Sequence, residues 1–289
     1  MPPKKQQVAV VADSSVSLPP AMLKDLGIEV APLEVRFGDR VYLDGTDIAP
    51  ATFYRMLPTA DPLPTTSAPR PGSFLAAFQR AGVLADQVVC VTLSAHLSAV
   101  HESALKAAEM ARETIPGVAI HVVDSLTAAS AEALVATAAA KAARNGESLE
   151  QVLEACQYVI DRVTLLAFLD TLHFVWKGGR IPHVAAWMGD VLNVKPMLEM
   201  KKGDIHLVAR PRTRPRATER LLNIVAERSA GRSLVINVFH AADPEGAQQL
   251  QQRVDGTFHC QESFISEFTP AIGVHTGPGL LGLAFYALD

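Results

Sequence analysis

The chain has 289 residues, of which 49% are hydrophobic and 6% aromatic, and its formal net charge is −4. This length is comfortable for two domains. The apolar content excludes a disordered chain, which needs low hydrophobicity and high charge. The mild negative charge disfavours a broad nucleic-acid surface, because such surfaces carry an excess of lysine and arginine.

The sequence shows no signal for export or membrane insertion. Its first seven residues lack the apolar core of a signal peptide, and no apolar run reaches the ~20 residues that span a bilayer. Cys90, Cys156 and Cys260 are widely spaced and form no metal or redox motif. We therefore expect a cytoplasmic protein with no integral membrane segment.

Strands and helices alternate along the first half of the chain. Apolar runs predict strands at 8–12, 28–35, 40–43, 87–93 and 118–123. Helical spacing predicts helices after Pro19, at 53–57, from 71 to about 82, at 97–114 and at 128–144. Four prolines between 62 and 71 predict a loop there.

The second half continues the alternation. Ser148 and Thr213 are expected to cap helices. Strands are expected at 163–168, 234–239 and 264–268, a hairpin at 197–208, and helices at 244–254 and 278–288. The pattern predicts an α/β fold with mostly parallel sheets. We expect two domains, 1–160 and 161–289, with segments that cross between them.

Polar residues follow several of the predicted strands. Asp13 and Ser14 come after the first strand, and Ser94 and Ser125 come after two later ones. In open α/β sheets, ligands bind at the carboxyl ends of the strands. These four side chains are therefore expected to line a site.

Two hydroxyl-bearing loops could hold an anion. Thr66 and Ser67 lie between prolines, and Ser98 lies near the start of a helix, where free amides favour negative charge. The same residues also suit ordinary turns and helix caps, and both interpretations stay open.

Two further segments carry single functional candidates. Arg180 follows Gly178-Gly179, and a fixed guanidinium there would suit a phosphate or carboxylate. His275 and Gly277 lie in a glycine-rich segment before the last element. The alternatives are a solvated arginine beyond a helix end and a structural histidine.

Common enzyme motifs are absent from the sequence. It contains no G-x-G-x-x-G after the first strand, no phosphate-binding G-x-x-x-x-G-K-S/T, no G-x-S-x-G and no paired histidines at metal-ligand spacing. An autonomous kinase, dehydrogenase or hydrolase of the common types is therefore disfavoured, and no cofactor or metal is expected.

Four segments in order resemble the DegV family of bacterial fatty-acid-binding proteins. They are Ala12-Asp13-Ser14-Ser15, Leu169-Asp170-Thr171-Leu172, Lys177-Gly178-Gly179-Arg180-Ile181 and His275-Thr276-Gly277-Pro278-Gly279. The resemblance covers nearly the whole chain. It implies two α/β domains with an acyl chain in a tunnel at or near their interface.

The resemblance also implies a function and its residues. A non-catalytic carrier would bind a long-chain fatty acid and present the carboxylate to a fatty acid kinase, and the acyl phosphate would feed phospholipid synthesis. Thr66, Ser67 and Ser98 would bind the carboxylate, and Arg180 and His275 would serve phosphotransfer or the partner at the mouth. The resemblance also leaves room for transient contact of the protein with a membrane surface.

Two other functions stay open as well. Ser98 and His275 could serve a lipid hydrolase or acyltransferase, although the sequence identifies no acid partner for such a triad. The chain could also be a lipid-sensing regulator. Ala99 stands where the family usually has glycine, which puts the acyl preference and the pairing with the partner in doubt.

Overall fold

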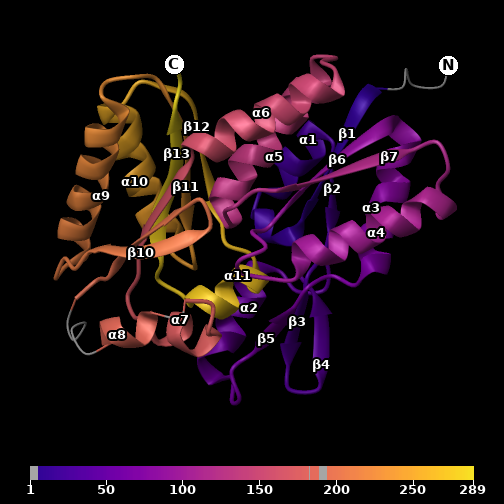
Figure 1. Cartoon of the computed structure of the whole chain (residues 1–289). Coiled ribbons are helices and arrows are strands. Elements are labelled where there is room, and N and C mark those ends of the chain that lie inside the picture. Colours follow the sequence, from indigo (N-terminus) through magenta and orange to yellow (C-terminus); the bar gives the residue numbers. More distant parts are fainter. Residues whose placement is uncertain (1–5, 182, 189–193) are drawn as a thin grey trace.

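The computed structural model describes residues 6–181, 183–188 and 194–289 (Figure 1). The first five residues, part of the segment judged to lack a signal peptide, lie outside these ranges. In the first half the elements are β1 (Gln6–Asp13), α1 (Pro20–Leu26), β2 (Ile28–Ala31), β3 (Glu34–Phe37), β4 (Arg40–Leu43), α2 (Pro50–Met56), β5 (Thr65–Ser67), α3 (Pro71–Leu84), β6 (Ala85–Thr92), α4 (Val100–Thr114), β7 (Ala119–Asp124), α5 (Ala129–Arg144) and α6 (Leu149–Arg162). In the second half they are β8 (Thr164–Phe168), α7 (His173–Gly178), α8 (Val184–Met188), β9 (Met197–Lys201), β10 (Asp204–Ala209), α9 (Arg214–Ser229), β11 (Leu234–His240), α10 (Pro244–Thr257), β12 (Cys260–Glu267), α11 (Pro270–Thr276) and β13 (Leu281–Ala287).

The first half is built on a parallel sheet in the order β2-β1-β6-β7. Its central strands are continuous apolar runs, such as residues 8–12, because helices cover both faces. Helices α3 and α4 pack against these strands, and α5 packs against β1 and β6 from the other side (Figure 1). The parallel arrangement agrees with the sequence prediction for this half.

A small antiparallel sheet, in the order β4-β3-β5, lies below the parallel one in Figure 1. The prediction that residues 62–71 form only a loop was wrong, because Thr65–Ser67 is strand β5. A strand of three residues is too short to leave a periodic signal between four prolines. Its pairing with β3 places Thr66 opposite Val35.

The second half is built on a six-stranded sheet in the order β10-β9-β8-β13-β11-β12. Only β11 and β12 pair in parallel, whereas the other neighbours are antiparallel. The prediction of mostly parallel sheets was therefore wrong for this half. The short turn between β9 and β10 joins antiparallel strands. Strand β13 lies between β8 and β11 and runs antiparallel to both.

The predicted closing helix at 278–288 was wrong too, because strand β13 occupies this segment. Every residue of β13 is buried, so its apolar run has no alternating face, and such a run cannot be told from a buried helix by periodicity. Gly282 lies so close to the Leu166 carbonyl oxygen that no side chain would fit between them.

The predicted helix starts at Ser148 and Thr213 are confirmed. Ser148 forms a reciprocal capping box with Gln151, and Thr213 accepts a hydrogen bond from the Arg216 amide. Arg214, in the first turn of α9, pairs with Asp170 and Asp243.

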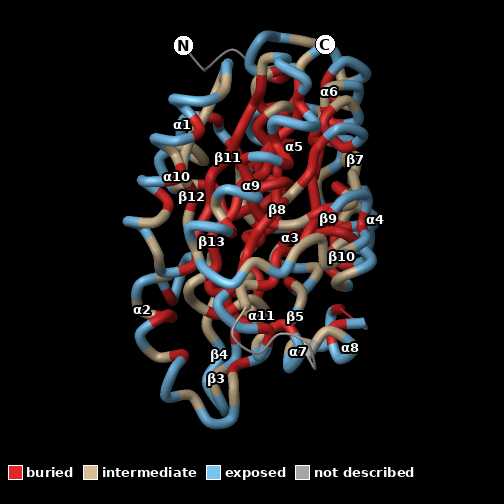
Figure 2. Tube along the Cα trace, turned by 90° about the vertical axis from the view of Figure 1, so that its left-hand side faces the viewer, coloured by how far each residue is buried: buried red, intermediate tan, exposed pale blue. Residues whose placement is uncertain are grey.

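Helix α5 lies between the two large sheets. It packs against β1 of the first sheet and against β11 and β13 of the second, and most of its residues are alanine or other small buried side chains. Figure 2 shows the buried segments concentrated in the sheets and in α5. Because alanine brings backbones close, this helix packs against both sheets within a single hydrophobic core.

The large sheets fall within residues 6–124 and 164–287, while α11 crosses to pack against α2, β3 and β5. No helix in the described part of the chain is long and apolar enough to cross a membrane.

Candidate functional site

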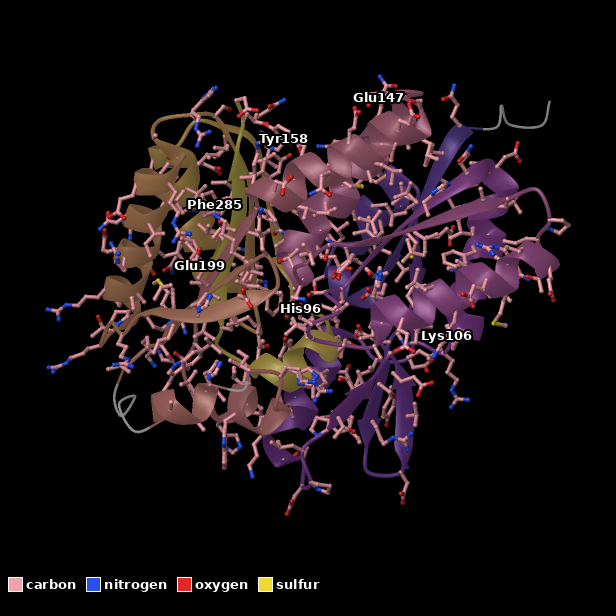
Figure 3. All side chains as sticks on the ribbon, viewed as in Figure 1. His96, Lys106, Glu147, Tyr158, Glu199 and Phe285 are labelled. Carbon is pink, nitrogen blue, oxygen red and sulfur yellow. The ribbon has the colours of Figure 1, made fainter. Side chains whose placement is uncertain are left out.

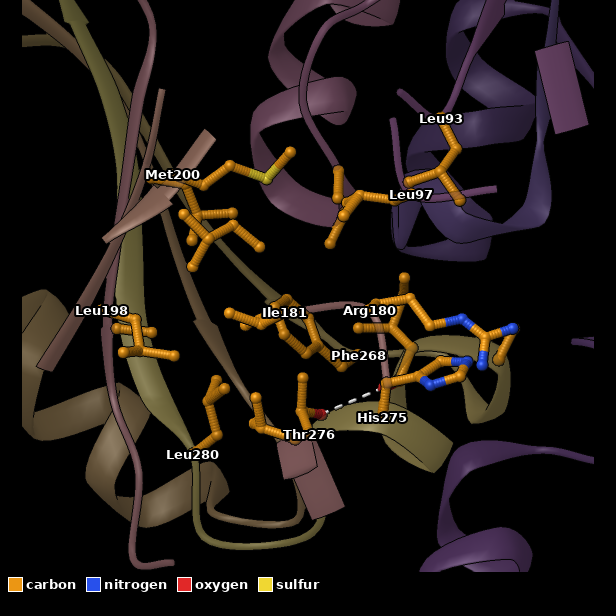
Figure 4. A pocket seen from close by; sticks show the side chains of 18 of the residues that line it. Leu93, Leu97, Arg180, Ile181, Leu198, Met200, Phe268, His275, Thr276 and Leu280 are labelled. Carbon is orange, nitrogen blue, oxygen red and sulfur yellow. Dashed lines mark hydrogen bonds between the residues drawn. The ribbon is translucent and has the colours of Figure 1, made fainter. Parts of the chain in front are cut away.

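An apolar cavity that is partly open to solvent lies where the two halves meet (Figure 4). Leu93 and Leu97 line it from the first half, and Leu198, Met200 and Ile205 line it from the second. These side chains come from the loop after β6 and from the β9–β10 hairpin. The same two segments touch across the halves, since a Cβ atom added to Gly203 would lie 2.5 Å from the His96 Nδ1 atom. Figure 3 shows His96 near the centre of the molecule.

Most polar side chains that line the cavity come from the predicted site. They are Thr66, Ser98, Arg180 and His275, which the sequence predicted, together with Thr276, which it did not. Figure 4 places Arg180 beside His275, away from Leu198 and Leu280. Glu199 also contributes to the lining, but its carboxylate pairs with Arg228 of α9. The cavity therefore combines apolar walls with a few polar groups.

The Thr66 hydroxyl and the His275 imidazole form a hydrogen bond, with 2.7 Å between Oγ1 and Nε2. The two residues are far apart in sequence and meet because α11 packs against β5. Burial, aided by the nearby Arg180 charge, lowers the pKa of His275 to about 4. His275 is therefore a neutral imidazole at pH 7, and its donor and acceptor roles follow from its tautomer.

The other ring nitrogen of His275 is buried and has no hydrogen-bond partner among the described residues. It faces the backbone of Gly178, where an added Cβ atom would lie only 2.7 Å from Nδ1. Glycine at this position therefore lets α7 approach the imidazole.

Arg180 leaves the chain just after α7. The helix ends at Gly178, and Gly179 adopts a left-handed conformation with φ of 67°. The exposed Arg180 guanidinium donates to the Gly178 carbonyl oxygen at 2.6 Å. Helix α7 therefore ends at the two glycines, and Arg180 places a cation at the cavity beside His275.

Ser98 lies in the loop between β6 and α4 and is half-buried at the cavity. The loop is fixed by Ser94, whose amide donates to the Thr127 carbonyl oxygen and whose hydroxyl accepts from the His96 amide. The predicted helix start at residue 97 lies three residues early, since α4 begins at Val100.

Four predicted site-lining residues are not part of the cavity lining. Asp13 accepts hydrogen bonds from the Leu93 and Ser15 amides, and the Ser14 hydroxyl donates to Asp44. Ser94 and Ser125 hydrogen-bond within their own turns. These polar residues fix the loops at the strand ends.

Ser67 and Gly277 are not part of the lining either. Ser67 donates to Glu34 at 3.3 Å and points away on β5. Gly277 has a φ of 70° and lies against the Phe174 ring, which leaves no room for a side chain.

Asp44 is a buried carboxyl that the sequence analysis did not single out. It contacts the Ser14 hydroxyl and the Ala271 amide at the start of α11. No sequence pattern joins residue 44 to residue 271, so only the fold exposes this connection. Among the described residues, no group of three or more His, Cys, Asp or Glu side chains could hold a metal ion.

The model of the DegV family, described as uncharacterised proteins, matches residues 7–288. The chain belongs to the DegV family. A DegV domain-containing protein of Streptomyces coelicolor, SCO2569, is 36% identical over 280 residues, which cover 96% of this chain and 98% of the relative.

Solved DegV structures share the fold. The structure of a DegV family protein from Thermus thermophilus, described as fatty acid binding, has a TM-score of 0.89 at 30% identity and covers 98% of this chain and 100% of that one. A stearic-acid-binding protein from Eubacterium ventriosum has a TM-score of 0.88 at 27% identity, with 97% and 98% covered. The α/β fold expected from the resemblance is therefore confirmed.

Proposed function

We propose that this protein binds one long-chain fatty acid in the cavity and presents its carboxylate to a fatty acid kinase. The observation that carries the proposal is an apolar cavity where Thr66 and His275 are bonded to each other and Arg180 lies beside them. A fatty acid has the same division between a long apolar tail and one charged end. The fatty-acid binding described for the Thermus thermophilus and Eubacterium ventriosum proteins supports the proposal.

The tail supplies most of the affinity. A C16 chain buried at ~0.8 kcal/mol per CH₂ gains roughly 10 kcal/mol before the costs of ordering. Leucine, methionine and alanine side chains line the walls. The head group therefore needs only to be oriented, and it need not be neutralised by a tight ion pair.

The polar side chains suit an attacking carboxylate. Hydroxyls of Thr66 and Ser98 would donate to its oxygens without reducing its nucleophilicity as a bidentate arginine would. The neutral His275, with its proton on Nε2, would donate to Thr66 Oγ1 and so leave the hydroxyl hydrogen of Thr66 for the carboxylate. The exposed Arg180 would instead stabilise the negative charge that develops on the phosphoryl group during transfer.

The triad needed for a hydrolase is not assembled. His275 Nε2 pairs with Thr66, and within the described ranges no hydrogen bond joins Ser98 to His275. A triad also needs an acid that orients the other ring nitrogen, whereas Nδ1 has no partner in the part of the chain that is described. These contacts favour a non-catalytic carrier over the hydrolase or acyltransferase.

The carrier would act in the cytoplasm, where the acyl phosphate would feed phospholipid synthesis, with transient contact at a membrane surface. A lipid-sensing regulator would share the cavity and would differ in its partner. Ligand-dependent partner binding without ATP chemistry would favour the regulator.

The experiment separates fatty-acid binding from transfer. Arg180→Ala is mixed with fatty acid kinase, ATP and a C16 acid, with Arg212→Ala as the matched control because Arg212 is exposed and outside the cavity. We expect Arg180→Ala to keep fatty-acid occupancy and to lose ~10²–10³ in the rate of acyl-phosphate formation. Equal rates in both variants, or no acyl phosphate with the unaltered chain, would contradict the proposal.

A further inference from the structure

Helix α11 is attached to the small sheet at both of its ends. In its last turn, His275 bonds to Thr66 of β5 at 2.7 Å. In its first turn, the Ala271 amide donates to Asp44 Oδ1 at 3.2 Å, and Asp44 directly follows β4. Ala271 and His275 are four residues apart, so they lie one turn apart on the same side of the helix.

Asp44 is itself held firmly. Its side chain is 2% exposed, and its second oxygen, Oδ2, accepts a hydrogen bond from the Ser14 hydroxyl at 2.6 Å. Ser14 is fixed in turn, since its Oγ accepts from the Leu33 amide at 3.0 Å and its carbonyl oxygen accepts from the Thr269 hydroxyl at 3.3 Å. Each carboxylate oxygen therefore has its own donor, one from the first half of the chain and one from α11.

Burying the Asp44 carboxylate costs desolvation free energy, although α11 has other contacts that hold it in place. Gly273 packs against the Phe53 and Tyr54 rings, and the Tyr54 hydroxyl donates to the Phe268 carbonyl oxygen at 3.2 Å. Burial raises the pKa of Asp44 to about 6, and the nearby Asp13 adds to the rise. The buried Asp44 carboxylate therefore costs folding free energy at neutral pH. Because it lies where α11 meets the small sheet, beside the candidate site, this cost indicates a role beyond stability.

We propose that Asp44 is a positioning residue that fixes the first turn of α11 and thereby sets the place of the His275 imidazole against Thr66 and the cavity. Gly273 packs α11 against the Phe53 and Tyr54 rings of α2, and Thr269, just before the helix, hydrogen-bonds to Ser14 and Ser17. The hydrogen bond from Ala271 to Asp44 adds the contact that joins the first turn of α11 to the end of β4. The consequence for phosphotransfer rests on the proposed function, whereas the placement of His275 does not.

The test reads His275 directly. Imidazole ¹⁵N and ¹³C NMR signals are recorded on the full chain without fatty acid or kinase, and the His275 signals are assigned by their loss in His275→Gln. Asp44→Ala should shift these signals. Asp44→Asn should largely restore them, because the amide oxygen still accepts from Ala271. Asp47→Asn is the matched control, since Asp47 lies in the same turn and, among the described residues, its carboxylate accepts from the Leu43 amide alone.

A second readout uses transfer with fatty acid kinase and ATP. Asp44→Ala should keep fatty-acid occupancy and lose roughly 10²-fold in rate, as expected for misplaced reacting groups. Should Asp44→Ala fail to fold, Ser14→Ala, which removes the donor to Oδ2, should shift the His275 signals in the same direction. Unchanged His275 signals in a folded Asp44→Ala or Ser14→Ala variant would overturn the inference. Shifted signals in a chain that binds no fatty acid would support the inference and refute the proposed function.

Discussion

His275 is a buried histidine that stays neutral at pH 7 because burial, aided by the Arg180 charge, lowers its pKa to about 4. In the unfolded chain, the same side chain has a pKa of ~6.5. Between these two values the unfolded state binds a proton that the folded state does not. The contribution of His275 to stability is therefore complete above pH 6.5 and is lost as the pH falls towards 4.

His275→Gln should remove this part of the pH dependence. Between pH 6.5 and 4, the unaltered chain should lose on the order of 3 kcal/mol more unfolding free energy than the variant. Asp44, with its pKa raised to about 6, acts in the opposite direction, so the two proteins must be compared at each pH. Urea unfolding at several pH values measures the difference, with His206→Gln, exposed on β10, as the control. Parallel curves for His275→Gln and the unaltered chain would contradict the buried neutral state.

At the scale of single residues, the sequence predicted the cavity-lining residues Thr66, Ser98, Arg180 and His275 through their place in family-like loops. It did not predict that Thr66 bonds to His275 or that Asp44 holds α11. These contacts join residues more than 200 positions apart, and no local spacing encodes them. The polar residues at strand ends were expected at the ligand, but Asp13 and Ser14 are used to fix loops.

Helix α7 approaches the His275 imidazole of α11 at Gly178, which has no side chain. An alanine at Gly178 would bring its Cβ atom within 2.7 Å of His275 Nδ1, so either the imidazole or α7 must shift. We expect the imidazole to move and its hydrogen bond to Thr66 to lengthen. Alanine also favours a helix over glycine by roughly 1 kcal/mol. Gly178→Ala should therefore leave the melting temperature nearly unchanged while it lowers phosphotransfer.

The matched control is Gly256→Ala near the end of α10, where an added Cβ atom meets nothing within 4 Å. We expect this variant to transfer at the normal rate. Phosphotransfer rates and melting temperatures measured on both variants test whether Gly178→Ala lowers transfer without lowering stability. A normal rate of phosphotransfer in Gly178→Ala would show that α7 can shift to make room, and that its close approach to His275 is not needed for function.

At the scale of elements, the sequence predicted most helices and the strands with clear ends. Ser148 and Thr213 carry their capping signals locally, so both helix starts could be found. Strand β13 could not be predicted, because every residue in it is buried and its apolar run fits a helix and a strand equally well. Strand β5 was hidden by the prolines around it.

At the scale of the whole molecule, alternating strands and helices predicted the α/β class, but not the strand directions of the second sheet. Pairing in that sheet is set by contacts between distant segments, such as β8 with β13. The boundary near residue 160 stays a prediction. The extents of the two large sheets fit it, while α11 carries His275 across to the small sheet.

The central claim is that the space between the two halves holds one fatty acid. Native mass spectrometry of the purified chain, followed by denaturing extraction and lipid analysis, tests it most directly. Ala128→Trp serves as the control, because this half-buried residue lines the cavity and a larger side chain would fill it. We predict one C14–C18 fatty acid per unaltered chain and almost none in the variant. A lipid-free chain that also fails to bind added C14–C18 acids would contradict the account.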